Sequence, residues 1–325
     1  MEGAIEGTIA TSSSVLNGGV VCVFGSAVAT LTSVAIDDTA TTSDYTLKGG
    51  VFYIYSGAIA TLRSVAVEGI AALSSSYLNG GVLFNNGGGI ATLDRCTIAN
   101  ATAISSTMNV LGGCLGSFGI LQLVATNITG CHAIAASPGR VAESGGAHIG
   151  SGQLIMSQGT SFDGCVADIG STLSTLGGTA VYMLPAPPGR WVAAAKCKVY
   201  REACDTTTPS NNFGGSACPS VRAACSALTT TNATVDSVGC EPLLFSQPCD
   251  WSSMPQLLGN DVHALPQAPI NVDYPYRCAA GLLGSNSTEG QSTALCGGPT
   301  PAGTYQPDEA GTAALECTAG EQSPT

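Results

Sequence analysis

The chain has 325 residues, of which 42 are glycine and only 10% are charged, and its formal net charge is −12. This length is enough for a sizeable core, and the apolar composition excludes a disordered chain. Such an acidic chain would repel phosphate backbones, which argues against nucleic acid as a partner. No apolar run is long and unbroken enough to span a bilayer.

A repeat marked by glycine pairs occupies the first half of the chain. The pairs begin at Gly18, Gly49, Gly80, Gly112, Gly145 and Gly177, at steps of 31, 31, 32, 33 and 32 residues. A fixed period of this size is typical of a solenoid or an array. Within the period, segments 28–36, 59–67 and 90–98 align without a gap, 120–128 follows with drift, and 154–162 follows with one insertion.

Two apolar positions recur in these segments. One is shared by Leu31, Leu62, Leu93 and Leu123, and the other by Ile36, Val67, Ile98, Ile128 and Phe162. The flanking residues alternate in polarity, which is the period of a strand, and a helical repeat is excluded by the missing 3.6-residue rhythm. We therefore predict an all-β fold for residues 1–185: a right-handed single-stranded parallel β-helix of about five to six rungs.

Each predicted rung carries two or three short strands, with glycine pairs at a corner where φ must be positive. Equivalent Leu, Ile and Val side chains should stack inside as ladders, about 4.8 Å apart. Residues 5–19 resemble residues 67–81, which lie two periods later. We therefore expect the chain to begin within a rung of a longer solenoid, whose upstream rungs and signal peptide are absent.

The repeat resembles that of the polymorphic outer-membrane proteins and related pectin-lyase-like β-helices. The segments that carry this resemblance are 80–103, 112–133 and 145–167, and it covers about the first 185 residues. The resemblance implies the β-helix fold. It leaves the activity open, because this fold hosts adhesins and enzymes alike.

The rest of the chain is rich in cysteine. Nine of the fourteen cysteines follow residue 190, which predicts a disulfide framework and an extracellular or cell-surface location. Prolines 185, 187 and 188 end the repeat, and residues 186–277 are predicted to be a stapled cap or linker. Its six cysteines are Cys197, Cys204, Cys218, Cys225, Cys240 and Cys249, and their pairing stays open.

Residues 278–325 contain the segment PAGTY at 301–305 and resemble an incomplete ephrin-receptor-like cysteine-rich repeat. That family has cysteine where this chain has Thr300, which leaves the local pairing open. Four N-x-[ST] triplets fit a secreted glycoprotein, and they begin at Asn100, Asn127, Asn232 and Asn286.

The most regular polar feature is a column one residue past the second apolar position. It consists of Glu6, Asp37, Glu68, Ala99, Thr129 and Asp163. Glu6, Asp37 and Glu68 would lie on successive rungs about 5 Å apart, where they form either a solvated corner or a calcium site with oxygen ligands. Asp38 follows Asp37 directly, and alternation along a strand predicts that the two point to opposite faces.

Other candidates receive structural interpretations. Arg63 and Asp94 should form an exposed pair on adjacent rungs, and Thr30, Thr61 and Thr92 an outward ladder explained by β-propensity rather than by ice or sugar binding. His148 has no matching carboxylate motif. His132, Cys131 and Cys165 do not have the spacing of a metal site, so buried or disulfide-bonded cysteine is favoured.

We therefore expect no catalytic residues and no cofactor beyond calcium. The favoured function is that of a non-enzymatic extracellular or adhesin-like β-helix protein, which binds glycans or a partner surface through many weak contacts. The alternatives are a fragment of a polysaccharide lyase or hydrolase, and a structural cell-wall protein.

Overall fold

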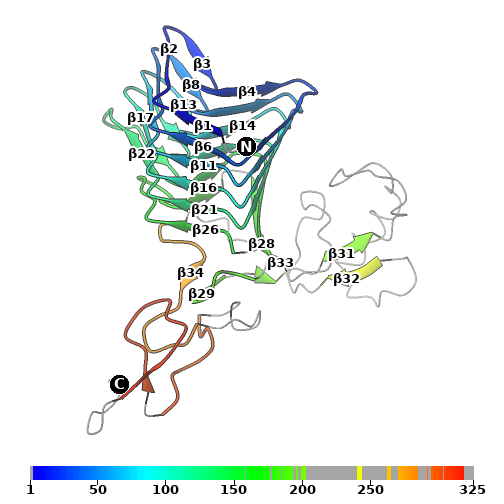
Figure 1. Cartoon of the computed structure of the whole chain (residues 1–325), viewed down its shortest axis with the longest axis vertical. Coiled ribbons are helices and arrows are strands. Elements are labelled where there is room, and N and C mark those ends of the chain that lie inside the picture. Colours follow the sequence, from blue (N-terminus) through cyan, green and yellow to red (C-terminus); the bar gives the residue numbers. More distant parts are fainter. Residues whose placement is uncertain are drawn as a thin grey trace.

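The computed structural model describes residues 3–157, 159–175, 178–183, 185–192, 270–284, 291, 294–302 and 304–317, and the backbone of 195–196, 199–202, 240–243 and 262–264. Over these ranges the chain is all-β, without an α-helix. It forms a parallel β-solenoid of about five turns followed by a disulfide-bearing region, which confirms the predicted fold class (Figure 1). The described residues include no helix that is long and apolar enough to cross a membrane.

Each of the first five turns contributes one short strand to each of five parallel sheets, numbered here in the order in which the chain visits them, and the described part of a sixth turn adds a strand to sheets 1, 4 and 5. Sheet 1 contains β1 (Gly3–Glu6), β6 (Val34–Asp37), β11 (Ala66–Glu68), β16 (Thr97–Ala99), β21 (Asn127–Thr129) and β26 (Ser161–Asp163). Sheet 2 contains β2 (Ile9–Ser12), β7 (Ala40–Ser43), β12 (Ala71–Ser74), β17 (Thr102–Ser105) and β22 (His132–Ala135). Sheet 3 contains β3 (Val15–Asn17), β8 (Thr46–Lys48), β13 (Leu78–Asn79), β18 (Val110–Leu111) and β23 (Ala142–Glu143).

Sheets 4 and 5 complete the turn. Sheet 4 contains β4 (Val21–Phe24), β9 (Phe52–Tyr55), β14 (Leu83–Asn85), β19 (Leu115–Ser117), β24 (Ala147–Ile149) and β27 (Leu173–Thr175). Sheet 5 contains the parallel strands β5 (Val28–Thr32), β10 (Ile59–Arg63), β15 (Ile90–Asp94), β20 (Ile120–Val124), β25 (Gln153–Ser157) and β28 (Thr179–Met183). It is extended by β33 (Val262–Ala264), which pairs antiparallel with β28, and by β30 (Ala195–Lys196), which pairs antiparallel with β33. The prediction of two or three strands in each rung was too low, because several strands span only two or three residues, too few to show alternation in the sequence.

The remaining strands form three antiparallel pairs outside the parallel sheets: β29 (Arg190–Trp191) with β34 (Tyr276–Arg277), β31 (Val199–Glu202) with β32 (Cys240–Leu243), and β35 (Thr304–Tyr305) with β36 (Leu315–Glu316).

The predicted register is correct through the first five turns. Leu62 pairs with Leu31 and Leu93, and the second ladder stacks Ile36, Val67 and the equivalent residues that follow. Both ladders point into a main core enclosed by sheets 1, 4 and 5. A smaller core between sheets 2 and 3 contains Leu47, Ala72, Leu78, Ala103, Val110, Ala133 and Ala142.

The glycine pairs lie at the corner between sheets 3 and 4, where the two cores meet. The first glycine has a positive φ, for example 66° at Gly49 and 65° at Gly80, as predicted. The second position of the pair requires glycine for a different reason, which the sequence analysis missed: a side chain there would clash with neighbouring turns and the opposite wall. A Cβ on Gly81 would lie 2.9 Å from Ala103 Cβ in sheet 2 and 2.1 Å from the Gly113 carbonyl oxygen. Glycine therefore lets the chain approach the opposite wall and narrow the solenoid into a waist.

The fifth glycine pair is one residue out of phase with the others. Leu111 pairs with Glu143, so Ser144, and not Gly145, occupies the position of Gly112. Ser144 has a φ of 66°, and its buried hydroxyl donates to the Ala147 carbonyl at 2.5 Å. This local hydrogen bond supports a left-handed conformation that non-glycine residues rarely adopt. The pair that begins at Gly177 lies partly outside the described residues.

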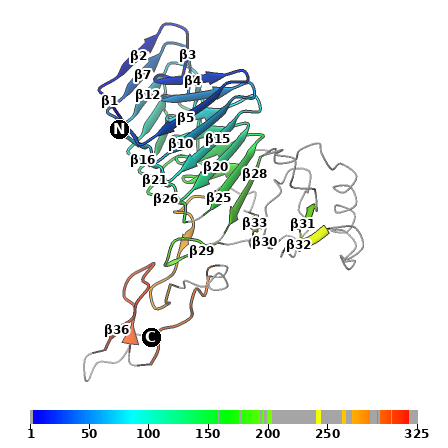
Figure 2. The same cartoon turned by 45° about the vertical axis from the view of Figure 1, so that its right-hand side comes forward.

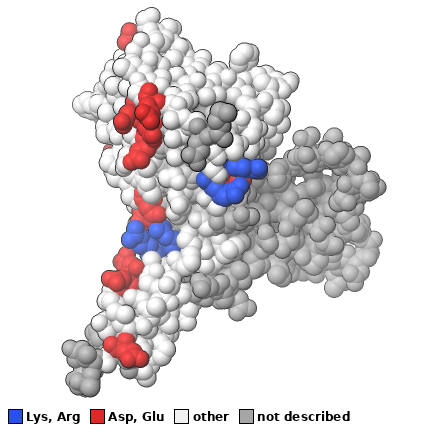
Figure 3. All heavy atoms as spheres, viewed as in Figure 1, with Lys and Arg blue, Asp and Glu red and all other residues white. Residues whose placement is uncertain are grey.

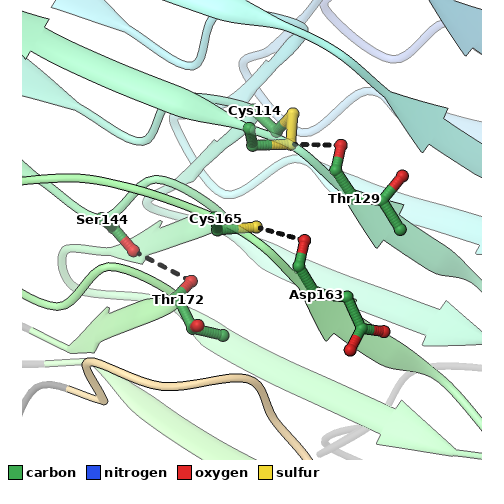
Figure 4. Close-up of a disulfide and its surroundings, with 7 residues drawn as sticks. Cys114, Thr129, Ser144, Asp163, Cys165 and Thr172 are labelled. Carbon is green, nitrogen blue, oxygen red and sulfur yellow. Dashed lines mark hydrogen bonds between the residues drawn. A yellow bond between two sulfur atoms is a disulfide. The ribbon is translucent and has the colours of Figure 1, made fainter.

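A disulfide crosses the waist and joins the fourth turn to the start of the fifth. Cys114, at the corner between sheets 3 and 4, is bonded to Cys131, at the corner between sheets 1 and 2, with 5.7 Å between their Cα atoms (Figure 4). Cys165 occupies the position of Cys131 in the next turn, where the residue opposite is Gly146, so its buried thiol forms no disulfide there and instead donates to the Asp163 carbonyl at 3.7 Å. Cys131 is therefore bonded and Cys165 buried, as the sequence analysis favoured.

The last turn is covered by residues 270–277, which lie at the end of the predicted cysteine-rich segment. Phe162 and Tyr274 exchange two backbone hydrogen bonds of 2.7 and 3.0 Å, and Leu173 pairs with Ile270. The side chains of the six cysteines between 197 and 249 lie outside the described residues. In the tail, Cys278 is bonded to Cys296, and Cys317 has no disulfide partner among the described cysteines.

Candidate functional site

The predicted acidic column is present at the corner between sheets 1 and 2. Backbone pairing places Glu6 beside Asp37 and Asp37 beside Glu68, and the column continues through Ala99, Thr129 and Asp163. On the face seen in Figure 3, acidic side chains gather in a vertical stripe on the upper solenoid. The sequence pattern therefore predicted the backbone neighbours correctly.

Asp38 does not behave as predicted. It lies just past the strand, in a corner position with a φ of 50°, where the alternation of side chains no longer applies. Asp37 and Asp38 therefore line the same open depression instead of opposite faces. The other residues that line it are Glu6, Glu68, Gly69 and Asn100.

One side-chain contact orders this depression: Asn100 Nδ2 donates to Glu68 Oε1 at 3.1 Å. Among the described residues, no three His, Cys, Asp or Glu side chains are grouped closely enough to hold a metal ion. Calcium binding by Glu6, Asp37 and Glu68 therefore stays a prediction. It would require these carboxylates to move toward one another, at a cost in Coulomb repulsion that the cation must offset.

The last acid of the column is neutralised by arginines from the segments that cover the last turn. Asp163 Oδ1 lies 2.5 Å from a guanidinium nitrogen of Arg190 and 3.4 Å from one of Arg277. Arg277 also contacts Asp273, whose carboxylate accepts the Gly164 backbone N–H at 2.7 Å. These partners are far apart in the sequence, so the repeat pattern contained no signal for them.

The predicted pair of Arg63 and Asp94 is confirmed, with 2.9 Å between Nε and Oδ2. Arg95 contacts the same carboxylate at 3.1 Å, and the hydrogen bonds from Arg95 and Arg63 lower the pKa of Asp94. Both guanidinium groups are largely exposed, so each pair contributes at most about 1 kcal/mol to stability. This corner is a small cationic site on an otherwise acidic chain.

His148 is the described side chain that comes nearest to a hydrolytic centre. Its Nδ1 lies 2.8 Å from Ser174 Oγ and 3.6 Å from a carboxylate oxygen of Glu143. Both partners therefore face the same nitrogen, whereas a catalytic triad needs them on opposite nitrogens. Nε2 is buried without a partner, and burial lowers the pKa of His148 to about 4. This geometry describes a neutral, packed histidine.

Figure 2 shows the strands of sheet 5 side by side from β5 to β28, and apart from Arg63 and Asp94 the outward positions of β5, β10, β15 and β20 are uncharged. The predicted ladder of Thr30, Thr61 and Thr92 is in register, and Thr92 Oγ1 donates to Gln122 Oε1 at 3.1 Å. A second outward column beside it contains Val28, Ile59, Ile90 and Ile120. Hydroxyl and aliphatic side chains thus repeat side by side along the solenoid.

The outer face of sheet 4 carries an aromatic cluster that the sequence analysis missed. Cys22, Tyr53, Phe84 and Gly116 form one outward column, and Phe24 and Tyr55 pair in the next, which continues through Asn86 and Phe118. The aromatic rings contact one another within strand β9 and across turns. The signal was available, because 51–55, 82–86 and 114–118 follow the glycine pairs at equal distances, but the segments had been aligned on another strand.

Comparisons of the chain with protein-family models, with curated proteins and with solved structures find no match.

Proposed function

We propose that this chain belongs to a non-enzymatic extracellular or cell-surface protein, adhesin-like in action, which binds glycans or a partner surface through repeated weak contacts. Within this class, we propose that residues 1–185 are related to pectin-lyase-like β-helices with polymorphic outer-membrane-type repeats, and residues 278–325 to an ephrin-receptor-like module. The glycine-pair repeat and the Cys278–Cys296 disulfide support this assignment. The disulfides also support an oxidising compartment.

The observation that carries the proposal is the in-register repetition of outward side chains along sheets 4 and 5. Each turn presents the same small contact again, about 4.8 Å further along a rigid rod. Contacts that are weak singly become effective when a linear ligand or a surface engages several of them at once.

A paired binding and cleavage assay tests the proposal. The purified chain, as a monovalent protein and displayed on beads, is incubated with a polysaccharide panel and with intact cells. We expect retention that rises at least tenfold on beads, with no release of reducing ends. Released oligosaccharides would favour the lyase or hydrolase alternative. Absence of binding in both formats would favour a purely structural protein.

A further inference from the structure

The aromatic side chains of the solenoid are distributed unevenly. Aromatic residues make up only 6% of the chain, yet five of them occupy the two outward columns of sheet 4. They are Phe24, Tyr53, Tyr55, Phe84 and Phe118. An outward strand position needs no aromatic ring for its conformation, and exposed apolar clusters usually mark interaction sites.

The five rings form a solvent-facing row backed by a buried row. Phe24 is 69% exposed and Tyr55 43%, and Phe118 is partly exposed further along the same column, whereas Tyr53 and Phe84 are only 5% and 2% exposed. The buried row supports the outer one along the axis of the solenoid.

Ring contacts hold Tyr55 and Phe118 of the outer row in place. Tyr55 stacks on Tyr53 with 5.7 Å between ring centroids and a 12° interplanar angle, and Tyr53 stacks on Phe84 at 5.9 Å and 13°. Phe118 meets Phe84 edge-on at 5.7 Å. The Phe118 ring also occupies space that a side chain at residue 150 would need, because a Cβ on Gly150 would lie 2.2 Å from Phe118 Cε1. Rings that are already ordered lose little side-chain entropy when they bind.

The polar surroundings limit what this face can bind. Its two columns contain no charged residue through the first four turns, and beside them the Lys48 Nζ lies 5.9 Å from the centre of the Tyr53 ring. The acidic depression lies at another corner, between sheets 1 and 2. Asn86 and the Tyr55 hydroxyl supply hydrogen-bonding groups within the row of rings.

The shape favours a thin, linear ligand. Three partly or fully exposed rings in single file offer far less apolar area than the roughly 800 Å² per partner that a stable protein–protein interface buries. A pyranose ring has an apolar C–H face, which stacks on an aromatic ring, and a rim of hydroxyl groups, which suits amide and phenol partners. Successive sugar units of one chain could contact successive turns.

We propose that the outward aromatic row of sheet 4, formed by Phe24, Tyr55 and Phe118 with Asn86, binds an uncharged polysaccharide chain that runs along the solenoid axis. This inference rests on the proposed surface-binding function and names its ligand class and contact face. An acidic glycan is disfavoured, because the chain carries a net charge of −12 and the two columns of this face contain no cation through the first four turns.

The test compares Tyr55→Ala with Tyr77→Ala, because both tyrosines are 43% exposed and Tyr77 lies at a different corner, between sheets 2 and 3. Affinity electrophoresis of the full chain is run in gels that contain β-glucan, mannan or polygalacturonate. Tyr55→Ala should weaken retention by a neutral polysaccharide about tenfold, Phe118→Ala likewise, and Tyr77→Ala less than twofold. Tyr55→Phe should retain most of the binding, and circular dichroism checks the fold of each variant.

The outcomes separate this inference from the proposed function. If the unmodified chain binds a polysaccharide and both aromatic variants bind equally well, or Tyr77→Ala loses as much, the sheet 4 site is wrong while the surface-binding function stands. Retention by polygalacturonate alone would overturn the neutral ligand class. If the unmodified chain binds neither polysaccharides nor cells, the proposed function fails first.

Discussion

The leucine ladder of sheet 5 allows a graded test of the solenoid. Leu31, Leu62 and Leu93 occupy one column on successive turns, but their burial differs: Leu31 is only partly buried in the first turn, Leu62 is 3% exposed and Leu93 is 1% exposed. Leu→Ala at each of these three positions therefore removes the same atoms from surroundings that are buried to different extents.

The expected magnitudes follow from burial. Leu→Ala at a fully packed position loses about 2–5 kcal/mol, which includes the cost of the cavity that remains. Leu93→Ala and Leu62→Ala should lie within that range. Leu31→Ala should cost about 1–2 kcal/mol, because part of its side chain already contacts water. Leu62→Asp would add a buried, unpaired charge and cost several kcal/mol more.

Urea unfolding followed by circular dichroism gives the free energies, and hydrogen exchange in the affected turns checks whether unfolding is cooperative, since solenoids can unfold in parts. Thr61→Ala is the matched control, because Thr61 neighbours Leu62 but points outward; it should change stability by less than about 0.5 kcal/mol. Equal losses for Leu31→Ala and Leu93→Ala, or a loss for Thr61→Ala as large as that for Leu62→Ala, would refute the ladder as the source of stability.

Three further outcomes are expected. Burial lowers the pKa of His148 to about 4, below the ordinary value near 6.5, so as the pH falls the unfolded chain binds a proton before the folded chain does. The free energy of unfolding should therefore decrease as the pH falls from about 6.5 to 4. In urea titrations His148→Gln should make this decrease smaller, and an unchanged pH dependence would show that another group causes it. Calorimetry with millimolar calcium should show weak binding that Asp37→Ala abolishes. If the unmodified chain gives no heat, the calcium prediction is wrong and the acidic column is a solvated corner. Among the described residues, the strands of the first turn pair on one side only, so this chain should self-associate with rising concentration in sedimentation experiments, and a strictly monomeric chain would contradict that reasoning.

The sequence predicted the parts of the fold that repeat. A fixed period with alternating polarity determines which residues stack, so the leucine ladder, the acidic column and the Arg63–Asp94 pair were all placed correctly. Strand number was underestimated, because strands of only two to five residues, separated by corners, show little alternation of polarity in the sequence.

What the sequence could not predict depends on contacts across the solenoid or from distant segments. The second glycine of each pair is required by the opposite wall, as Gly81 against Ala103 shows. The arginine partners of Asp163 come from segments beyond the repeat. The shift at Ser144 was hidden because a hydroxyl that bonds its own turn can replace the conformational freedom of glycine.

A column of serines, which in the sequence resembles low-complexity composition, has a structural role in the repeat. Ser43, Ser74 and Ser105 are in register, and the Ser74 hydroxyl lies 2.9 Å from the Tyr45 carbonyl oxygen and 3.0 Å from that of Tyr77. Each hydroxyl can satisfy turn carbonyls of its own and the preceding turn. These serines therefore need no role in binding.

Two surface features could bind a ligand, the acidic depression beside sheet 1 and the aromatic row of sheet 4, and they differ in whether the backbone conformation explains their residues. Corner positions past sheet 1 have a positive φ in every turn, 50° at Asp38 and 53° at Asn100, with glycine in the other four. Asp and Asn tolerate this conformation better than other side chains, so their presence at this corner has a sufficient conformational reason. Tyr55 and Phe118 have no such reason, since any β-forming residue suits an outward strand position or its edge. Side chains that the backbone does not require, and that buried rings nevertheless hold in place, are the stronger candidates for a function in binding.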